Sequence, residues 1–368
     1  MLDIKKKTEE ILRGCIETTE DGINLYTPDC KNKYGAFWTR DFSYMVENAG
    51  DLIPDEDKEN AIDFFIDHAR EDGWIPDRVK ADGTALYTAG DEHFPALSNL
   101  DTGCFLALLI DSYISDRDIG TAKAKYEKRR GPLIKSIELL DTDENGIIVN
   151  LTTPPHSPYG FTDTIAKTGK LCYETLLYWR ALKVLVKWEK LTGHETESYE
   201  SRIKGIEDTF EDIFLNGEGM LDAATLDCRQ LDVWASAYAV SIGFPLTEKT
   251  RKSIASWLID NYEDIVESGQ IRQLRKGESW EKTFILVKPG TYQNGACWAT
   301  ATGWFVDAMI DSDRKLASRT VKEAMDYFEN VGIFECINGE YRKLDTFVAS
   351  IVTLYGLSKR YPDLFERR

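Results

Sequence analysis

The sequence of 368 residues predicts an all-α fold, an (α/α)6 barrel in which six inner helices alternate with six outer helices. Apolar residues recur at helical spacing in twelve segments, and the connections between these segments are alternately short and long. Segments that follow a long connection are apolar on most sides, whereas segments that follow a short one are amphipathic. These observations predict an inner and an outer ring, with every long loop on the same rim.

The twelve predicted helices divide equally between the two halves of the chain. They lie at about 3–14, 38–52, 56–72, 101–115, 118–140 and 170–192, and then at about 196–214, 232–243, 247–264, 294–310, 313–330 and 345–359. The short connections make consecutive helices antiparallel neighbours. Because no linker or low-complexity stretch interrupts the pattern, we expect residues 1–368 to form a single domain.

Composition and charge narrow the class of protein. The formal net charge of -18 opposes the binding of nucleic acid and of anionic membranes, so a neutral substrate fits better. The first residues contain no apolar signal-peptide core, and no stretch of about eighteen apolar residues follows, which predicts a cytoplasmic protein. The seven cysteines form no CxxC motif and suggest neither a disulfide framework nor a zinc site. No metal or cofactor is expected, and the sequence leaves the oligomeric state open.

The first long loop ends in an aromatic and charged cluster that suits a sugar. Trp38, Arg40 and Asp41 stand at the mouth of a predicted inner helix. Sugars are bound by such sets, because their apolar C–H faces stack on aromatic rings and carboxylates accept hydrogen bonds from their hydroxyl groups. The alternative is that Asp41 caps the helix while Arg40 pairs with a neighbouring acid.

The second long loop carries further candidates for substrate contact. Trp74, Asp77 and Arg78 lie in the segment GWIPDR, where a rigid turn is the structural alternative. Asp101 and Asp232 each follow a leucine at the start of an inner helix, where an aspartate also serves as an N-cap. We include both among the candidate substrate-binding residues.

The third long loop supplies the candidate proton donor. Asp163 follows Tyr159 and Phe161, and an acid held among rings has its pKa raised by desolvation, as a general acid requires. Glu174, at the start of the next helix, is a competing acid or a ligand of a sugar hydroxyl. Tyr159 is a candidate substrate contact.

The last two long loops supply a candidate base. Tyr292, Asn294 and Trp298 open a predicted inner helix and are candidate substrate contacts. Glu335 precedes an Asn-Gly turn, and it is placed to activate water from the opposite side of the barrel axis. An inverting glycosidase needs such a pair, with carboxyl groups about 6.5–9.5 Å apart. Glu340, in the same loop, is an alternative to Glu335.

The order of these motifs resembles that of inverting (α/α)6 glycoside hydrolases. W-x-R-D, G-x-I-P, G-x-x-D, Y-x-N-G and E-x(3)-G look closest to family 37 trehalases and to the α-glucosidases and mannosylglycerate hydrolases of family 63. Arg40 and Asp41 also resemble elements of glucoamylases and neutral invertases. The resemblance implies that Asp163 is the general acid and Glu335 the general base. We expect exo-acting hydrolysis of a short oligosaccharide or small glycoside, most simply an α-glucoside or α-mannoside.

Three other functions are compatible with the same barrel. A sugar epimerase or isomerase needs barrel histidines, and only His93 and His156 of the four histidines lie in rim loops. An unsaturated uronide hydrolase needs a basic site for a carboxylate, for which the candidates are Arg40, Arg78, Arg272 and Arg275. A non-catalytic sugar-binding barrel would use its acids only as caps and solvated charges.

Overall fold

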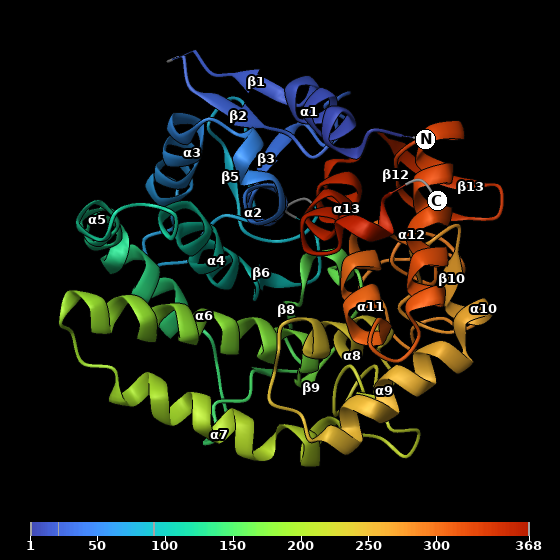
Figure 1. Cartoon of the computed structure of the whole chain (residues 1–368). Coiled ribbons are helices and arrows are strands. Elements are labelled where there is room, and N and C mark those ends of the chain that lie inside the picture. Colours follow the sequence, from blue (N-terminus) through green and yellow to red (C-terminus); the bar gives the residue numbers. More distant parts are fainter. Residues whose placement is uncertain (1, 21, 91–92, 367–368) are drawn as a thin grey trace.

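The structure is a computed structural model that describes residues 2–20, 22–90 and 93–366 (Figure 1). Its helices in these ranges are α1 (Ile4–Gly14), α2 (Thr39–Ala49), α3 (Asp55–Asp67), α4 (Thr102–Ile114), α5 (Ile119–Glu138), α6 (Cys172–Thr192), α7 (Glu197–Phe214), α8 (Val233–Ser241), α9 (Glu248–Asp260), α10 (Tyr262–Ile265), α11 (Thr302–Met309), α12 (Arg314–Asn330) and α13 (Val348–Arg360). Short 3-10 turns occur at Gly50–Leu52, Gly160–Thr162, Ala299–Ala301 and Pro362–Leu364.

Six of these helices form a closed inner ring. Contacts run from α2 to α4, α6, α8, α11 and α13 in turn, and α13 packs back against α2. The outer helices cover this ring: α1 packs on α13, α3 and α5 on α4, α7 on α6, and α9 and α12 on α11 (Figure 1). The predicted (α/α)6 barrel is therefore confirmed.

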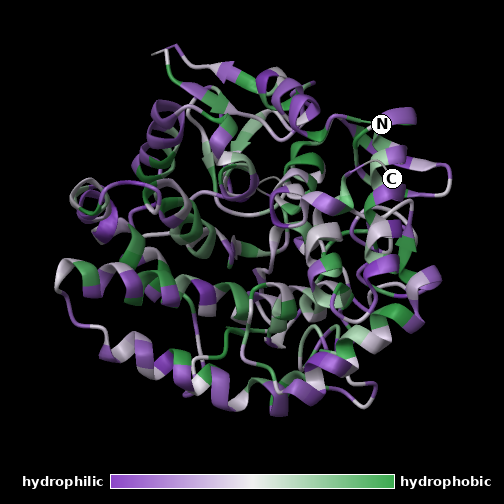
Figure 2. Cartoon of the chain, in the orientation of Figure 1, coloured by the Kyte–Doolittle hydropathy of each residue, from purple (hydrophilic) through white to green (hydrophobic). Residues whose placement is uncertain are grey.

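Local sequence explains where the outer helices begin and how α6 ends. The side chains of Asp118, Thr247 and Asp313 each accept a hydrogen bond from the backbone N–H three residues later, as N-caps do. Gly193 ends α6 in the left-handed conformation, which glycine adopts without steric cost. Figure 2 shows hydrophilic residues along outer helices such as α7 and hydrophobic residues toward the ring. The barrel core therefore forms where the helices face one another.

Short strands lie in the loops of the barrel. They are β1 (Ile16–Thr18), β2 (Asn24–Tyr26), β3 (Ala36–Trp38), β4 (Arg78–Lys80), β5 (Ala85–Leu86), β6 (Leu97–Asn99), β7 (Val149–Asn150), β8 (His156–Ser157), β9 (Gly169–Lys170), β10 (Val266–Glu267), β11 (Gln270–Ile271), β12 (Phe334–Asn338) and β13 (Tyr341–Asp345). Strands β3, β4 and β5 form an antiparallel sheet that sets Trp38 opposite Arg78. The predicted turn at Asn338 and Gly339 joins β12 to β13 in a hairpin.

The predicted helices 294–310 and 345–359 begin too early. The chain before α11 is extended, because Cys297 and Trp298 exchange backbone hydrogen bonds with Ile337 and Ile271. Likewise β13 extends to Asp345, and α13 begins only at Val348. The predicted helix 247–264 is divided at Asn261 into α9 and α10. In the first segment pairing with distant segments overrides the local helical pattern, and in the second the hairpin with β12 does so.

Candidate active site

A buried arginine at the start of α2 organises the loop end of the barrel. Arg40 is fully enclosed, and its guanidinium forms ion pairs with Asp101 (Nε to Oδ2, 2.7 Å) and with Asp77 (Nη2 to Oδ1, 3.0 Å). The amide of Asn99 also donates to Asp77 at 2.9 Å. A charge buried among fixed partners is held in one position. Asp77 and Asp101, predicted as substrate contacts, therefore hold Arg40.

The turn that carries the candidate acid rests directly on this arginine. The Gly160 N–H donates to Asp101 Oδ2 at 2.8 Å. A Cβ at position 160 would lie 1.5 Å from the Arg40 Cζ atom, so only glycine fits there. The 3-10 turn Gly160–Thr162 then delivers Asp163 to the same side of the barrel.

The pKa of the Asp163 carboxyl group lies near neutral pH. Burial raises its pKa to about 7, against the opposing effect of Arg40 and with a further increase from Asp77. The Gln293 side-chain amide donates to Asp163 Oδ1 at 2.8 Å and to the Gly160 carbonyl at 3.1 Å. A carboxyl group with this pKa retains much of its proton at pH 7, which is the state a general acid needs.

Asp41, which lines the same part of the barrel as Trp38, is a second acid with a raised pKa. Burial raises the pKa of Asp41 to about 8, opposed by Arg40 and reinforced by Asp77 and Glu335. Among the described residues, neither Asp41 Oδ1 nor Trp38 Nε1 has a hydrogen-bond partner. Buried polar groups in proteins are normally satisfied, so these two atoms are available to a ligand.

Glu335 lies on β12, buried beneath a tyrosine and a lysine. The Tyr34 hydroxyl donates a hydrogen bond to Glu335 Oε1. Lys343 Nζ lies 3.1 Å from Oε2 and forms an ion pair with it, but the angles are unsuitable for a hydrogen bond. Burial raises the pKa of Glu335, whereas Lys343 and Tyr34 lower it. The lysine also lies 3.2 Å from the centre of the Tyr292 ring. Both partners favour the carboxylate, the form that a general base requires.

These groups converge on one small cavity. Its volume is about 20 Å³, which is room for about one water molecule. It is lined by Pro28, Tyr34, Trp38, Arg40, Asp41, Gly160, Phe161, Asp163, Tyr292, Glu335 and Phe347. The structure therefore brings together six predicted residues: Trp38, Arg40, Asp41, Asp163, Tyr292 and Glu335.

Three further predicted residues lie directly behind the cavity wall. Trp298 stacks on Phe161, with ring centres 5.6 Å apart, and the Arg78 guanidinium lies 4.7 Å from the centre of the Trp38 ring. Tyr159 packs edge to face against the lining residue Phe161, with ring centres 5.5 Å apart, and stacks on Tyr173. These side chains position the wall and do not line the cavity in this structure.

Four predicted residues have structural partners elsewhere. Trp74 stacks on His156, and Glu174 accepts a hydrogen bond from the Tyr159 N–H at 2.8 Å. Asp232 caps α8 through the Ala235 N–H and lies 3.2 Å from Lys167 Nζ. Asn294 accepts from the Trp280 N–H at 2.7 Å. The exposed side chain of Glu340 lies on the hairpin and outside the cavity lining.

Seven residues of the site were not among the predicted site residues: Pro28, Tyr34, Gly160, Phe161, Gln293, Lys343 and Phe347. Gly160 and Phe161 belong to the motif that carries Asp163. The sequence could have indicated Gln293, because it lies between the predicted residues Tyr292 and Asn294. Lys343 is brought toward Glu335 by the hairpin, whose register pairs it with Cys336. Nothing in the local sequence distinguishes Tyr34 or Phe347 from other loop aromatics.

The groups needed for the alternative functions lie outside the cavity or are neutralised. Neither His93 nor His156 lines it, and burial lowers the pKa of His156. Arg40 and Arg78 are paired with aspartates, while Arg272 and Arg275 are paired with glutamates. In the part of the chain that the structure describes, no cluster of three or more His, Cys, Asp or Glu side chains could hold a metal ion. Within the same part, each helix is too short or too polar to cross a bilayer.

Comparisons with known proteins rest on structure. The sequence matches no family model and no curated protein. An uncharacterized conserved protein from Thermus thermophilus is 14% identical, with a TM-score of 0.69 over 96% of this chain and 99% of that one. A GH63 mannosylglycerate hydrolase from the same organism, in complex with glucose, is 15% identical, with a TM-score of 0.68 over 96% and 99%.

A rhamnosidase from Klebsiella oxytoca with rhamnose bound is also similar. It is 14% identical, with a TM-score of 0.66, and the match covers 98% of this chain and 63% of the rhamnosidase. At these identities the likeness shows a shared fold. The barrel predicted from the resemblance to family 63 is thus found in a solved member of that family.

Proposed function

We propose that this protein is an inverting glycoside hydrolase. The observation that carries the proposal is the convergence of Asp41, Asp163 and Glu335 on one cavity walled by aromatic rings. Solved structures with the same fold include a mannosylglycerate hydrolase and a rhamnosidase, which supports the reaction class.

In the proposed mechanism, the two catalytic carboxyl groups have opposite starting states. Asp163, whose pKa is about 7, donates its proton to the glycosidic oxygen as the bond to the leaving group breaks. Glu335, whose carboxylate form Lys343 and Tyr34 favour against the effect of burial, takes a proton from the water that attacks the opposite face of the sugar. One water enters the product, and the anomeric configuration inverts.

The remaining cavity residues bind the terminal sugar. Trp38 and Phe161 offer apolar surfaces, and the unpartnered Asp41 Oδ1 is free to bond a sugar hydroxyl. A cavity that ends in a buried wall suits exo-acting removal of one sugar. The substrate class we propose is a short α-glucoside or α-mannoside.

Substrate entry requires the segment that carries Tyr34 to move. A cavity of about 20 Å³ is far smaller than the 300 Å³ or more that is typical of a ligand pocket. Tyr34 lies on a loop whose neighbours Asn32 and Gly35 both have positive φ. Withdrawing its hydroxyl from Glu335 would free the space that the nucleophilic water and the sugar need.

A direct test is hydrolysis of a panel of nitrophenyl glycosides and natural disaccharides by the purified protein, in the presence of a chelator. Proton NMR then identifies the anomer that forms first. We expect an inverted product whose formation is abolished in Asp163→Asn. A retained configuration would exclude the inverting pair, and no hydrolysis across a broad panel would exclude the hydrolase.

A further inference from the structure

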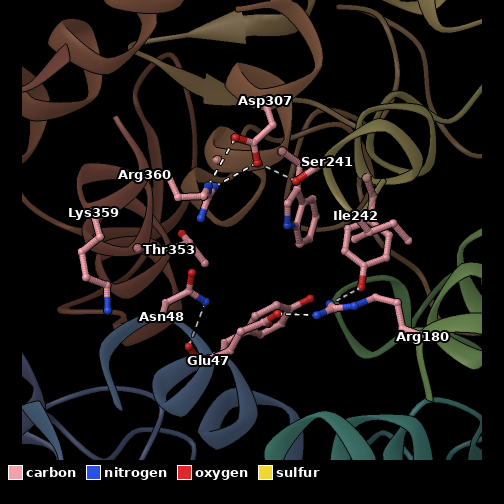
Figure 3. A pocket seen from close by; sticks show the side chains of 14 residues that line it. Glu47, Asn48, Arg180, Ser241, Ile242, Asp307, Thr353, Lys359 and Arg360 are labelled. Carbon is pink, nitrogen blue, oxygen red and sulfur yellow. Dashed lines mark hydrogen bonds and ion pairs between the residues drawn. The ribbon is translucent and has the colours of Figure 1, made fainter. Parts of the chain in front are cut away.

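A second cavity lies at the opposite end of the barrel axis, where the inner helices end. We call it the distal cavity, and its volume is about 400 Å³ (Figure 3). It is lined by Tyr44, Glu47, Asn48, Arg180, Tyr238, Ser241, Ile242, Gly303, Trp304, Asp307, Thr353, Gly356, Lys359 and Arg360. These residues come from α2, α6, α8, α11 and α13, so five of the six inner helices build it.

Charged side chains line its walls in matched pairs. Arg180 Nη2 lies 2.5 Å from Glu47 Oε1, and Arg360 Nη2 lies 2.9 Å from Asp307 Oδ2. The third cation, Lys359, pairs with Asp51 at 2.8 Å. Figure 3 shows Arg180 and Arg360 extending toward the cavity from opposite sides. The lining therefore offers many donors and acceptors while its charges balance.

The same side chains are held in place from behind. Arg180 Nη1 donates to the Tyr238 hydroxyl at 2.8 Å, and the Ser241 hydroxyl donates to Asp307 Oδ2 at 2.6 Å. A guanidinium has five N–H donors, so each arginine keeps donors beyond those its partners use. The polar groups are thus positioned before any ligand arrives.

Aromatic rings form the floor of the distal cavity. Tyr238 and Trp304 pack edge to face, with ring centres 5.0 Å apart, and Tyr44 lies beside Trp304. Tyr44 also stacks on Phe161, which lines the catalytic cavity. This aromatic layer separates the two cavities, so the distal cavity is a distinct site.

We propose that the distal cavity binds a small neutral polyol, a mono- or disaccharide. Its volume lies within the range of about 300–1,000 Å³ typical of small-molecule sites. Aromatic edges combined with fixed donors and acceptors match the alternating C–H and hydroxyl surfaces of a sugar. A charged ligand would have to displace one member of an existing ion pair and leave the other member without its partner. The proposal does not depend on hydrolytic activity.

Isothermal titration of the full-length protein with D-glucose, D-mannose and trehalose tests the proposal, with inorganic phosphate as the anionic probe. Thr353→Trp is designed to fill the cavity, because Thr353 lies on its wall with a hydroxyl bonded to the Ala349 carbonyl. Thr353→Val keeps the cavity open and is the matched variant. We expect at least one sugar to bind, with affinity lowered by about tenfold or more in Thr353→Trp and changed by less than about twofold in Thr353→Val.

Crystals of the unmodified protein soaked in the same sugars provide a second measurement that needs no variant. Sugar density between Arg180 and Asp307 is the expected result. Sugar found only between Tyr34 and Phe347, phosphate bound in place of the sugars, or no binding of any probe would each overturn the proposal. Circular dichroism of both Thr353 variants establishes that a loss of binding is not a loss of fold.

Discussion

The two ends of the barrel handle buried charge in opposite ways. At the loop end, Asp41, Asp163 and Glu335 surround a cavity of about 20 Å³, and burial raises the pKa of each. At the distal end, Glu47 and Asp307 pair with arginines around a cavity of about 400 Å³. Burial raises the pKa of Asp41 to about 8 and that of Asp163 to about 7, so these two acids gain and lose protons near neutral pH, whereas Glu335 is paired with Lys343. The first arrangement suits proton transfer, and the second suits recognition.

Backbone direction contributes to this difference. All six inner helices begin at the loop end and finish at the distal end, so the partial negative charge of their C-termini gathers there. Lys359 and Arg360 stand in the last turn of α13, where a cation is favoured. The loop end instead takes its side chains from turns and short strands, which place groups independently of the helices.

The largest effect is expected for Asp163, the proposed proton donor, compared with an exposed carboxylate. Replacing Asp163 by asparagine removes the proposed proton donor and should lower kcat/KM by about 10²–10⁴-fold. Steady-state kinetics on the substrate identified by the glycoside panel measures it. The control is Glu340→Gln, an exposed carboxylate near Glu335, which should leave kcat/KM within about twofold. Equal losses in the two variants would contradict the assignment.

The second prediction compares one arginine at each end. Arg40→Met leaves Asp101 buried without a cation and should lower the free energy of unfolding by about 3–5 kcal/mol. Arg180→Met breaks a pair whose side chains are 23% and 27% exposed, so about 1 kcal/mol is expected. Urea denaturation followed by circular dichroism measures both. Similar losses would mean that the two ends do not differ in how charge is buried.

The third prediction concerns pH. Asp163 must be protonated to act, so kcat/KM should fall as pH rises through about 7. Gln293 donates a hydrogen bond that favours the carboxylate and lowers this pKa. Gln293→Leu should therefore raise the pKa and move the alkaline limb to higher pH. A limb that stays in place, or moves to lower pH, would show that another group controls it.

The smallest effect is expected at Tyr34. Its hydroxyl donates to Glu335 and lowers the pKa of that carboxyl group in the free enzyme, so Tyr34→Phe should raise the pKa and move the acidic limb of kcat/KM to higher pH. At the pH optimum kcat/KM should fall by only about 2- to 10-fold, because one hydrogen bond contributes a net of about 0.5–1.5 kcal/mol and Lys343 remains. A pH–rate profile measures both quantities. An unchanged acidic limb would show that Tyr34 does not influence the pKa of the catalytic base.

The sequence predicts the helical barrel better than it predicts the site. Helical periodicity is a local property, and the bounds of α4 to α7 were predicted within about two residues, whereas the helix predicted at 56–72 ends already at Asp67. The chain before α11 was assigned wrongly because its partners, Ile271 and Ile337, lie in other loops. Pairing between distant segments leaves no periodic trace in either one.

Much the same reasoning explains which site residues were found. Asp41, Asp163 and Glu335 stand out as acids among loop aromatics. Asp77 and Asp101 have the same appearance in the sequence, yet they hold Arg40. Tyr34 reaches Glu335 across 301 positions, and Gln293 reaches Asp163 across 130. Only the folded loops show which acids face the cavity and which support it.

The contact between Gly160 and Arg40 limits how this sequence can diverge. A methyl group at position 160 would overlap the guanidinium, whereas at Gly131 or Gly217 a methyl group would meet nothing within 4 Å. A library randomised at these three positions and selected for folded protein should keep glycine alone at 160 and accept many residues at 131 and 217. Evolutionary drift would face the same filter, so position 160 can gain a side chain only if Arg40 is replaced as well.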